Sequence, residues 1–187
     1  MTQIFEKTGK ATPVTLVEAG PCQVTQVKNK EKDGYEAIQI GFEKIVKKNK
    51  IKKPMQNKPF RRLKEFLGGE YKVGDTIDVS VFQEGDKVKV SGVSKGKGFQ
   101  GPVKRWGFKG KLSVTHGTKH EERIHGSTGS SFPERVFPGK KMAGRMGADR
   151  VTVKNLKIIK IDKENNLLAV GGAVPGPNGA ILEIYVS

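Results

Sequence analysis

Short stretches of alternating apolar and polar residues, separated by turn residues, make up both ends of the chain and part of its middle. Near the amino terminus, residues 13–17, 24–27 and 35–40 are rich in β-branched and other β-forming residues, and Gly-Pro and Asp-Gly pairs separate them. Alternation with period two places successive side chains on opposite faces of a strand. We therefore expect three short strands in this region.

The same pattern continues farther along the chain. Residues 76–82 and 87–93 alternate cleanly across a Glu-Gly-Asp turn, which predicts a hairpin. Residues 151–161, 166–170 and 180–186 complete the set. Eight short strands at this spacing predict a closed or nearly closed antiparallel barrel.

Two stretches do not follow the strand pattern. Residues 60–67 could form one short helix, ended by a Gly-Gly pair. Residues 94–150 contain 11 glycines, no sustained period and few aliphatic clusters. A stretch of this length without a core of its own cannot offset its ordering entropy, so we expect a partner to hold it. A disordered surface loop is the alternative.

These patterns together predict the fold class. We expect an all-β protein: a small antiparallel β-barrel with a long, irregular, basic extension inserted between strands and one short helix. The barrel domain would comprise residues 1–93 and 151–187, with residues 44–64 as a basic arm that includes the short helix. Residues 94–150 would form the glycine-rich extension.

The distribution of charge along the chain indicates the kind of partner that the protein binds. The formal net charge is +16, from 35 Lys and Arg against 19 Asp and Glu, and such an excess indicates a polyanionic partner. Residues 44–64 hold ten basic residues and no acid, and residues 94–150 hold thirteen basic residues and four acids. The remainder is close to neutral. This distribution is typical of a compact domain with arms that contact nucleic acid, although a lysine run can also be a solvated surface.

Composition also indicates the cellular compartment of the protein. No apolar run has the length of a membrane span, and the first ten residues lack the apolar centre of a signal peptide. The single cysteine, Cys22, leaves no internal disulfide and fits a reducing compartment, so we expect a cytoplasmic protein without a membrane partner.

Candidate enzyme motifs lack their required context. Residues 96–101 spell the glycine fingerprint of dinucleotide sites, but Pro102 follows and no amphipathic helix develops, so backbone against a phosphate chain is favoured. The three histidines, His116, His120 and His125, match no zinc spacing, and we expect them to contact bases, ribose or phosphate. The serines and threonines nearby lack an acid–base partner for nucleophilic catalysis.

Trp106 is the single tryptophan of the chain. It lies in a Lys-Arg-Trp-Gly-Phe segment, a poor context for a buried core residue. Contact with RNA or with the base of the extension is therefore favoured over a place in the core. Met142 and Met146, four residues apart, are expected to pack under a loop because Gly144 and Gly147 interrupt any helix.

Several longer motifs are recognisable when taken together. They stand at residues 2–5 (TQIF), 24–28 (VTQVK), 94–101 (SKGKGFQG), 104–108 (KRWGF), 115–117 (THG), 126–129 (GSTG), 135–147 (RVFPGKKMAGRMG), 151–156 (VTVKNL) and 172–176 (GAVPG). In this order they resemble the bacterial type of the large-subunit ribosomal protein L3 family. The resemblance covers essentially the whole chain.

The resemblance implies a function and an architecture. It implies a six-stranded β-barrel on the subunit surface and a long extension that runs through ribosomal RNA toward the peptidyl transferase centre. It further implies binding to the 3′ part of large-subunit RNA, a role early in subunit assembly, and contacts with neighbouring large-subunit ribosomal proteins. No catalysis, cofactor, metal or small-molecule substrate is expected.

The residues expected to bind RNA come from the two basic segments. They are Lys44, Lys47, Lys48, Lys50, Lys52, Lys53, Arg61, Arg62, Lys95, Lys97, Lys104, Arg105, Trp106, Lys109, Lys111, His116, Lys119, Arg123, His125, Arg135, Lys140, Lys141, Arg145 and Arg150.

The chain departs from the family at three places. At the turn of the extension, members commonly have a His-Arg pair and a proline, and this chain has Glu122-Arg123 and His125. Members usually have residues ahead of the TQIF motif, so we expect an incomplete first strand or another chain in its place. Some members carry a methylated glutamine near the tip of the extension. This chain has Ser130 and Ser131 there, so the modification is not expected.

Two other classes of protein remain as alternatives: a barrel-type nucleic-acid enzyme and a transiently acting RNA chaperone. An enzyme would need clustered carboxylates for metal ions, and the basic segments contain only Glu121, Glu122, Glu134 and Asp149. A chaperone would not require the motifs in a fixed order, whereas this chain has them in the family's order from end to end. Stoichiometric co-sedimentation with large subunits through a moderate-salt wash distinguishes a ribosomal protein from both.

Overall fold

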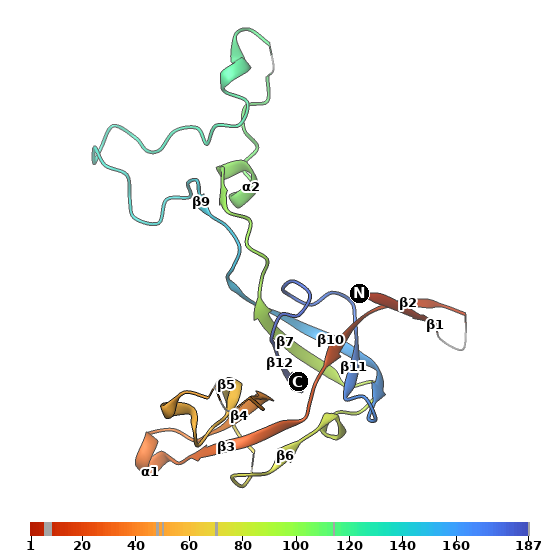
Figure 1. Ribbon diagram of the computed structural model, residues 1–187. Helices are drawn as coiled ribbons and strands as arrows, with labels where there is room; N and C mark the ends of the chain where they lie inside the picture. The colour runs from red at the N-terminus through yellow and green to blue at the C-terminus, as the bar shows by residue number, and fades with distance from the viewer. Residues whose placement is uncertain (6–8, 48, 50, 70, 114, 187) are drawn as a thin grey trace. The chain divides into compact units, whose positions relative to one another are not determined.

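The computed structural model describes residues 1–5, 9–47, 49, 51–69, 71–113 and 115–186 (Figure 1). Most of its regular structure is β-strand, and the helices are single turns. The chain is therefore all-β, as the sequence predicts. Among the described residues, no helix has the length and apolar character needed to cross a membrane.

Contacts between residues divide the chain into two compact units. Unit 1 comprises residues 1–90, 153–174 and 184–187, and unit 2 comprises residues 91–152 and 175–183. Unit 2 thus contains the glycine-rich stretch together with a short segment from the carboxyl-terminal region. Each unit is described separately below.

Strand pairing produces one six-stranded sheet in the order β1-β2-β11-β10-β7-β12. The strands predicted at β2, β7, β10, β11 and β12 are confirmed, with ends that differ by a few residues. Their bounds are β1 (Thr2–Phe5), β2 (Ala11–Glu18), β7 (Lys87–Val93), β10 (Arg150–Asp162), β11 (Leu167–Gly171) and β12 (Leu182–Val186).

A second sheet of unit 1 has four strands in the order β5-β4-β3-β6. A one-turn helix, α1 (Lys30–Asp33), connects β3 to β4, and the αL conformation of Gly34 ends it. The predicted strands within β3 and β4 are confirmed. The bounds are β3 (Cys22–Lys28), β4 (Ala37–Lys44), β5 (Phe60–Phe66) and β6 (Thr76–Ile77).

The core of unit 1 is organised around β11. This strand lies between β2 and β10, and its consecutive residues Leu168, Ala169 and Val170 are all buried. Since consecutive strand residues point to opposite faces, both faces of β11 are covered. Proline apart, the aliphatic and aromatic side chains that are buried among the described residues all lie in unit 1: Val14, Val24, Ala37, Ile38, Phe60, Val79, Val88, Val90, Ile158, Leu168, Ala169 and Val170.

The helix predicted at residues 60–67 is wrong, because this stretch forms strand β5. Its apolar residues recur three apart, which resembles a helix face, but β5 pairs with β4 over its whole length. The Phe60 ring lies against Gly41 of β4, where an added Cβ would come within 2.5 Å of the ring. Pairing with a neighbouring strand therefore overrides the local helical pattern.

The predicted strand at residues 76–82 and its hairpin with β7 are also wrong in part. Only Thr76–Ile77 forms a strand, β6, and it pairs with β3. A 3₁₀ turn, η3 (Val79–Val81), follows and buries Val79. The predicted Glu-Gly-Asp turn instead contacts β10, since the Gly85 amide donates to the Ile158 carbonyl at 2.8 Å.

A closed barrel is not found among the described residues. The strand order leaves β1 and β12 at the edges of one sheet and β5 and β6 at the edges of the other. Closure needs an unbroken ring of paired strands. The two-residue strand β6 pairs with β3 alone, so the ring is interrupted there.

The arrangement around β11 predicts that substitutions of two nearby leucines have very different effects on the stability of the protein. Leu168 is fully buried, whereas Leu16 of β2 is 54% exposed and pairs with Ala169. Leu168→Ala should lower the free energy of unfolding by about 2–5 kcal/mol because it opens a cavity. Leu16→Ala should change it by about 0.5 kcal/mol or less. Urea denaturation followed by circular dichroism measures both, and equal losses would contradict a core centred on β11.

Candidate nucleic-acid interface

The basic arm, residues 44–64, leaves the four-stranded sheet at the end of β4 and returns as β5. Its two ends are held together, because the Ile45 amide donates to the Pro59 carbonyl at 2.7 Å. A 3₁₀ turn, η2 (Lys53–Met55), lies between them. The arm is thus a loop fixed at its base, with lysines on the intervening chain.

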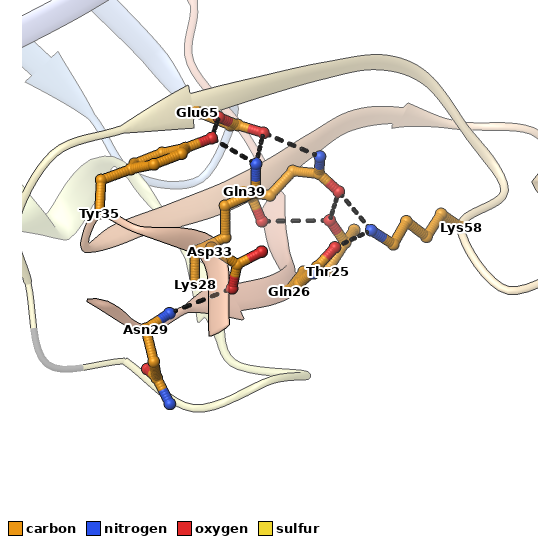
Figure 2. Close-up of polar contacts among 9 residues, drawn as sticks. All are labelled: Thr25, Gln26, Lys28, Asn29, Asp33, Tyr35, Gln39, Lys58 and Glu65. Carbon is orange, nitrogen blue, oxygen red and sulfur yellow. Dashed lines mark hydrogen bonds and ion pairs between the residues drawn. The ribbon is translucent and has the colours of Figure 1, made fainter. Parts of the chain in front are cut away.

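A lysine of the arm is used to fix this base. Lys58 Nζ donates to the side-chain oxygens of Gln26 on β3 and Gln39 on β4, at 2.5 and 2.6 Å (Figure 2). Thr25 also donates to the Gln39 side-chain oxygen, at 3.0 Å. Both acceptors are neutral amides, so Lys58 holds the arm without losing its charge to an acid.

The same polar network includes an ion pair at its other end. Lys28 Nζ lies 2.7 Å from Glu65 Oε1 of β5 and 2.5 Å from the Tyr35 hydroxyl, which donates to Glu65 Oε2 at 2.8 Å (Figure 2). The hydrogen bond to Glu65, then that to Tyr35, raises the pKa of Lys28. The bond from Lys28, then that from Tyr35, lowers the pKa of Glu65. These contacts join β3 to β5 across β4.

In unit 2, the extension begins as two paired limbs. The Ser94 amide donates to the Asp149 carbonyl at 2.9 Å, and the Lys97 amide donates to the Met146 carbonyl at 2.9 Å. Strands β8 (Phe99–Gln100) and β9 (Gly144–Arg145) continue the pairing. We call residues 94–106 and 142–150 the neck. The glycine-rich sequence did not predict a paired structure here.

A one-turn helix, α2 (Pro102–Trp106), completes the neck. The sequence predicts that no amphipathic helix develops after the glycine fingerprint, and the structure has a single turn there: Pro102 starts it, and Gly107 in the αL conformation ends it. One turn is shorter than the helix that a dinucleotide site requires. The fingerprint glycines belong to the neck, where the Gly98 carbonyl accepts from the Met146 amide at 3.0 Å.

Beyond the neck, the hydrogen bonds of the described residues in 108–141 stay within that stretch, and Lys141 lies over the Trp106 ring. Thr118, at the start of the 3₁₀ turn η4 (Thr118–His120), donates to the carbonyls of Ser113 and Thr115 at 2.9 and 3.0 Å. Among the described residues between 94 and 150, Pro102 and Thr118 alone are buried. Sequence reasoning predicted this lack of a core correctly.

The predicted RNA-binding cations are exposed almost without exception. Arg105 is half-buried, and Lys48 and Lys50 lie outside the described residues. His116 and His125 are exposed as well. The exposed cations are Lys44, Lys47, Lys52, Lys53, Arg61, Arg62, Lys95, Lys97, Lys104, Lys109, Lys111, Lys119, Arg123, Arg135, Lys140, Lys141, Arg145 and Arg150.

Few of these cations are paired with acids. Within the described part of the chain, ion pairs join Arg61 to Glu43, Lys111 to Glu121, Arg145 to Asp149 and Arg150 to Glu183. The first three of these pairs are exposed, and exposed pairs contribute about 1 kcal/mol or less, so a phosphate can replace the carboxylate there. The surface therefore presents mostly uncompensated positive charge.

The fold brings together two of the predicted residues, Arg105 and Trp106, with one carbonyl that sequence reasoning missed. Arg105 Nη1 and Trp106 Nε1 donate to the Met142 backbone oxygen at 2.9 and 2.8 Å. Every residue has a backbone carbonyl, so the role of the Met142 carbonyl cannot be predicted from the sequence. Gly144, beneath the Arg105 guanidinium, could have been found as a glycine at a close approach.

The histidines do not form a metal site. Among the described residues, no group of three or more histidine, cysteine, aspartate or glutamate side chains gathers as potential ligands. His116 has a positive φ of 54° and lies in the distal loop, as do His120 and His125. Clusters of exposed Lys and Arg such as those of the arm and the extension are an electrostatic feature typical of nucleic-acid-binding proteins.

Comparison with known proteins identifies the family. The family model of ribosomal protein L3 matches residues 70–174. Large ribosomal subunit protein uL3 of Chloroherpeton thalassium is 50% identical over 199 residues, covering 100% of this chain and 95% of that protein. The uL3 proteins of Carboxydothermus hydrogenoformans and Herpetosiphon aurantiacus are 48% and 49% identical, covering 98% and 97% of this chain and 91% and 90% of their own lengths.

The chain therefore belongs to the ribosomal protein L3 family. Members of this family are structural proteins of the large ribosomal subunit, and the chain is accordingly a ribosomal protein and not an enzyme. In bacteria, the ribosome lies in the cytoplasm.

The polar network of β3, β4 and β5 predicts a pH-dependent stability. Because the pKa of Glu65 is lowered in the folded state, its contribution is present above the unfolded glutamate pKa of about 4.3 and is lost as the pH falls through the folded value. Glu65→Gln should therefore be less stable than the parent protein at pH 7, and the difference should shrink below about pH 5.

Denaturation curves from pH 7 to pH 3 measure this difference. Glu36→Gln is a suitable control, because Glu36 is exposed and makes no hydrogen bond or ion pair within the described residues. A gap between Glu65→Gln and the parent that stays constant over the whole range would show that the carboxylate charge does not stabilise the network.

Proposed function

We propose that this protein binds large-subunit ribosomal RNA through the basic arm, residues 44–64, and the extension, residues 94–150. In the same proposal it aids early assembly of the subunit, and its extension reaches toward the peptidyl transferase centre. The observation that carries the proposal is the concentration of exposed, mostly unpaired cations on these two segments.

Phosphate binding is the chemistry that such segments support. Lysine and arginine neutralise phosphates, and each contact releases condensed counterions, so affinity accumulates along the chain. The extension has almost no buried side chains to stabilise it, and contact with RNA would supply that stabilisation. An enzyme of nucleic acids would instead require gathered carboxylates or a metal centre.

The proposal assigns different parts of the chain to different contacts. A barrel-like domain, residues 1–93 and 151–187, would lie at the subunit surface and contact neighbouring ribosomal proteins. Strands of the six- and four-stranded sheets would supply its walls, with the remaining edges covered in the assembled particle. The proposed RNA-binding residues are those of the arm and the extension named from the sequence.

Salt dependence tests the electrostatic part of this proposal. If six to ten phosphates are neutralised, affinity for a large-subunit RNA fragment should fall roughly a thousandfold or more between 50 and 200 mM salt. Filter binding or anisotropy across this range measures the slope. A nearly flat dependence would mean that the two basic segments do not contact phosphate.

A second prediction separates the limbs of the extension from its tip. Replacing Lys140, Lys141 and Arg145 by Gln should weaken incorporation into large subunits, because these exposed cations lie on the return limb. Deleting residues 125–133 removes no Lys or Arg, so incorporation should persist while subunit maturation or the peptide-bond rate falls.

The control for the triple replacement is Lys30, Lys32 and Lys163 to Gln, which removes the same charge from exposed positions of unit 1. Quantitative mass spectrometry of purified subunits measures incorporation, and a single-turnover assay measures peptide-bond formation. The assignment is wrong if the tip deletion abolishes incorporation while the triple replacement leaves it intact.

A further inference from the structure

Two side chains of the neck converge on one backbone oxygen. Arg105 and Trp106 are adjacent at the end of α2, on the outgoing limb, and both donate to the Met142 carbonyl on the return limb. A carbonyl oxygen has two lone pairs, so these two donors satisfy it fully. The two limbs are thereby joined by side chains at the point where backbone pairing through β8 and β9 ends.

The surroundings of Trp106 indicate a structural task for its ring. The indole Nε1 is already engaged, and the Arg105 guanidinium lies 4.9 Å from the ring centroid. Lys141 Nζ lies 5.6 Å from the same centroid and comes from the return limb. A tryptophan that is 42% exposed yet contacts Met142, Arg105 and Lys141 is not an unoccupied platform for a base.

Gly144 provides the space that this arrangement requires. A Cβ added at this position would lie 2.5 Å from Arg105 Nη1, so any larger residue would displace the guanidinium. The glycine has no positive φ that would explain it by backbone conformation. Its role is to let the Arg105 side chain pass across the return limb and reach Met142.

We propose that Arg105, Trp106 and Gly144 form a clamp that holds the neck closed in the protein before RNA binds. This inference rests on the proposed RNA-binding function and makes Arg105 and Trp106 positioning residues, not primary phosphate contacts. The closed neck presents cations of both limbs together: Lys95, Lys97 and Lys104 on one limb and Arg145 on the other. A surface arranged in advance binds more tightly, because less conformational entropy is lost on binding.

The alternative is that Arg105 simply binds a phosphate. Lysine distinguishes the two roles, because Arg105→Lys keeps the positive charge but loses the planar guanidinium that reaches Met142 and covers the indole. Gly144→Ala changes the return limb instead, and its added Cβ would displace the Arg105 guanidinium without any change of charge. The two variants should therefore produce the same defect if the clamp exists.

The first experiment uses the full-length protein without RNA. Trp106 is the single tryptophan of the chain, so its indole N–H gives one NMR signal and its fluorescence reports one environment. We expect slow exchange of this proton in the parent protein and faster exchange in Arg105→Lys and Gly144→Ala. Controls are Lys163→Arg, at an exposed position of unit 1 outside both basic segments, and Gly96→Ala, whose added Cβ meets only Ala148 at 4.0 Å.

The second experiment measures binding to a large-subunit RNA fragment over a range of salt. Loss of the clamp should weaken binding about fivefold to tenfold, the equivalent of one or two hydrogen bonds, with an unchanged salt slope since no charge is removed. Arg105→Lys combined with Gly144→Ala should be no weaker than either alone, because both remove the same contact. Lys163→Arg and Gly96→Ala should bind within about twofold of the parent protein, because neither touches the clamp or changes the charge.

The outcomes separate the clamp from the function on which it rests. Equal and rapid indole exchange in the parent protein and in Arg105→Lys would overturn the clamp, as would unchanged RNA affinity of Arg105→Lys and Gly144→Ala. A parent protein that shows a protected indole but no salt-dependent RNA binding would leave the clamp standing and overturn the proposed function.

Discussion

Burial of strand β11 on both faces is the interaction that allows this chain to carry its charge. A net charge of +16 destabilises a compact state by self-repulsion, and the stability of a domain is only about 5–15 kcal/mol. The chain gathers its fully buried aliphatic side chains in unit 1, around Leu168 and Val170. The glycine-rich stretch can then stay open and charged, because stability does not depend on it.

Both basic segments are held by neutral acceptors. Lys58 binds the amide oxygens of Gln26 and Gln39, and Arg105 binds the carbonyl of Met142. An acid in these places would fix the segment equally well but would cancel the charge that a polyanion recognises. Neutral oxygens accept hydrogen bonds from a cation and leave its field directed outward. At Lys58 and Arg105, attachment and recognition therefore do not compete for the same charge.

The sequence predicted those features that depend on a single segment. Alternation located most strands of both sheets, and charge clustering located the exposed cations of the arm and extension. Features that depend on a distant partner were missed. Residues 60–67 and 76–82 were misassigned because β4 and β3 select their conformations. The contact of Arg105 with Met142 joins residues 37 apart through a backbone oxygen, which no side-chain pattern encodes.

Pairing in the neck constrains how the length of the chain can vary among relatives. From Ser94 opposite Asp149 to Gln100 opposite Gly144, the outgoing limb advances six residues and the return limb five, because Met146 pairs with both Lys97 and Gly98. This register is otherwise regular. An insertion in a single limb would shift every later pair and turn its side chains to the other face. Natural insertions and deletions should therefore accumulate in residues 107–141, while the neck keeps a fixed length.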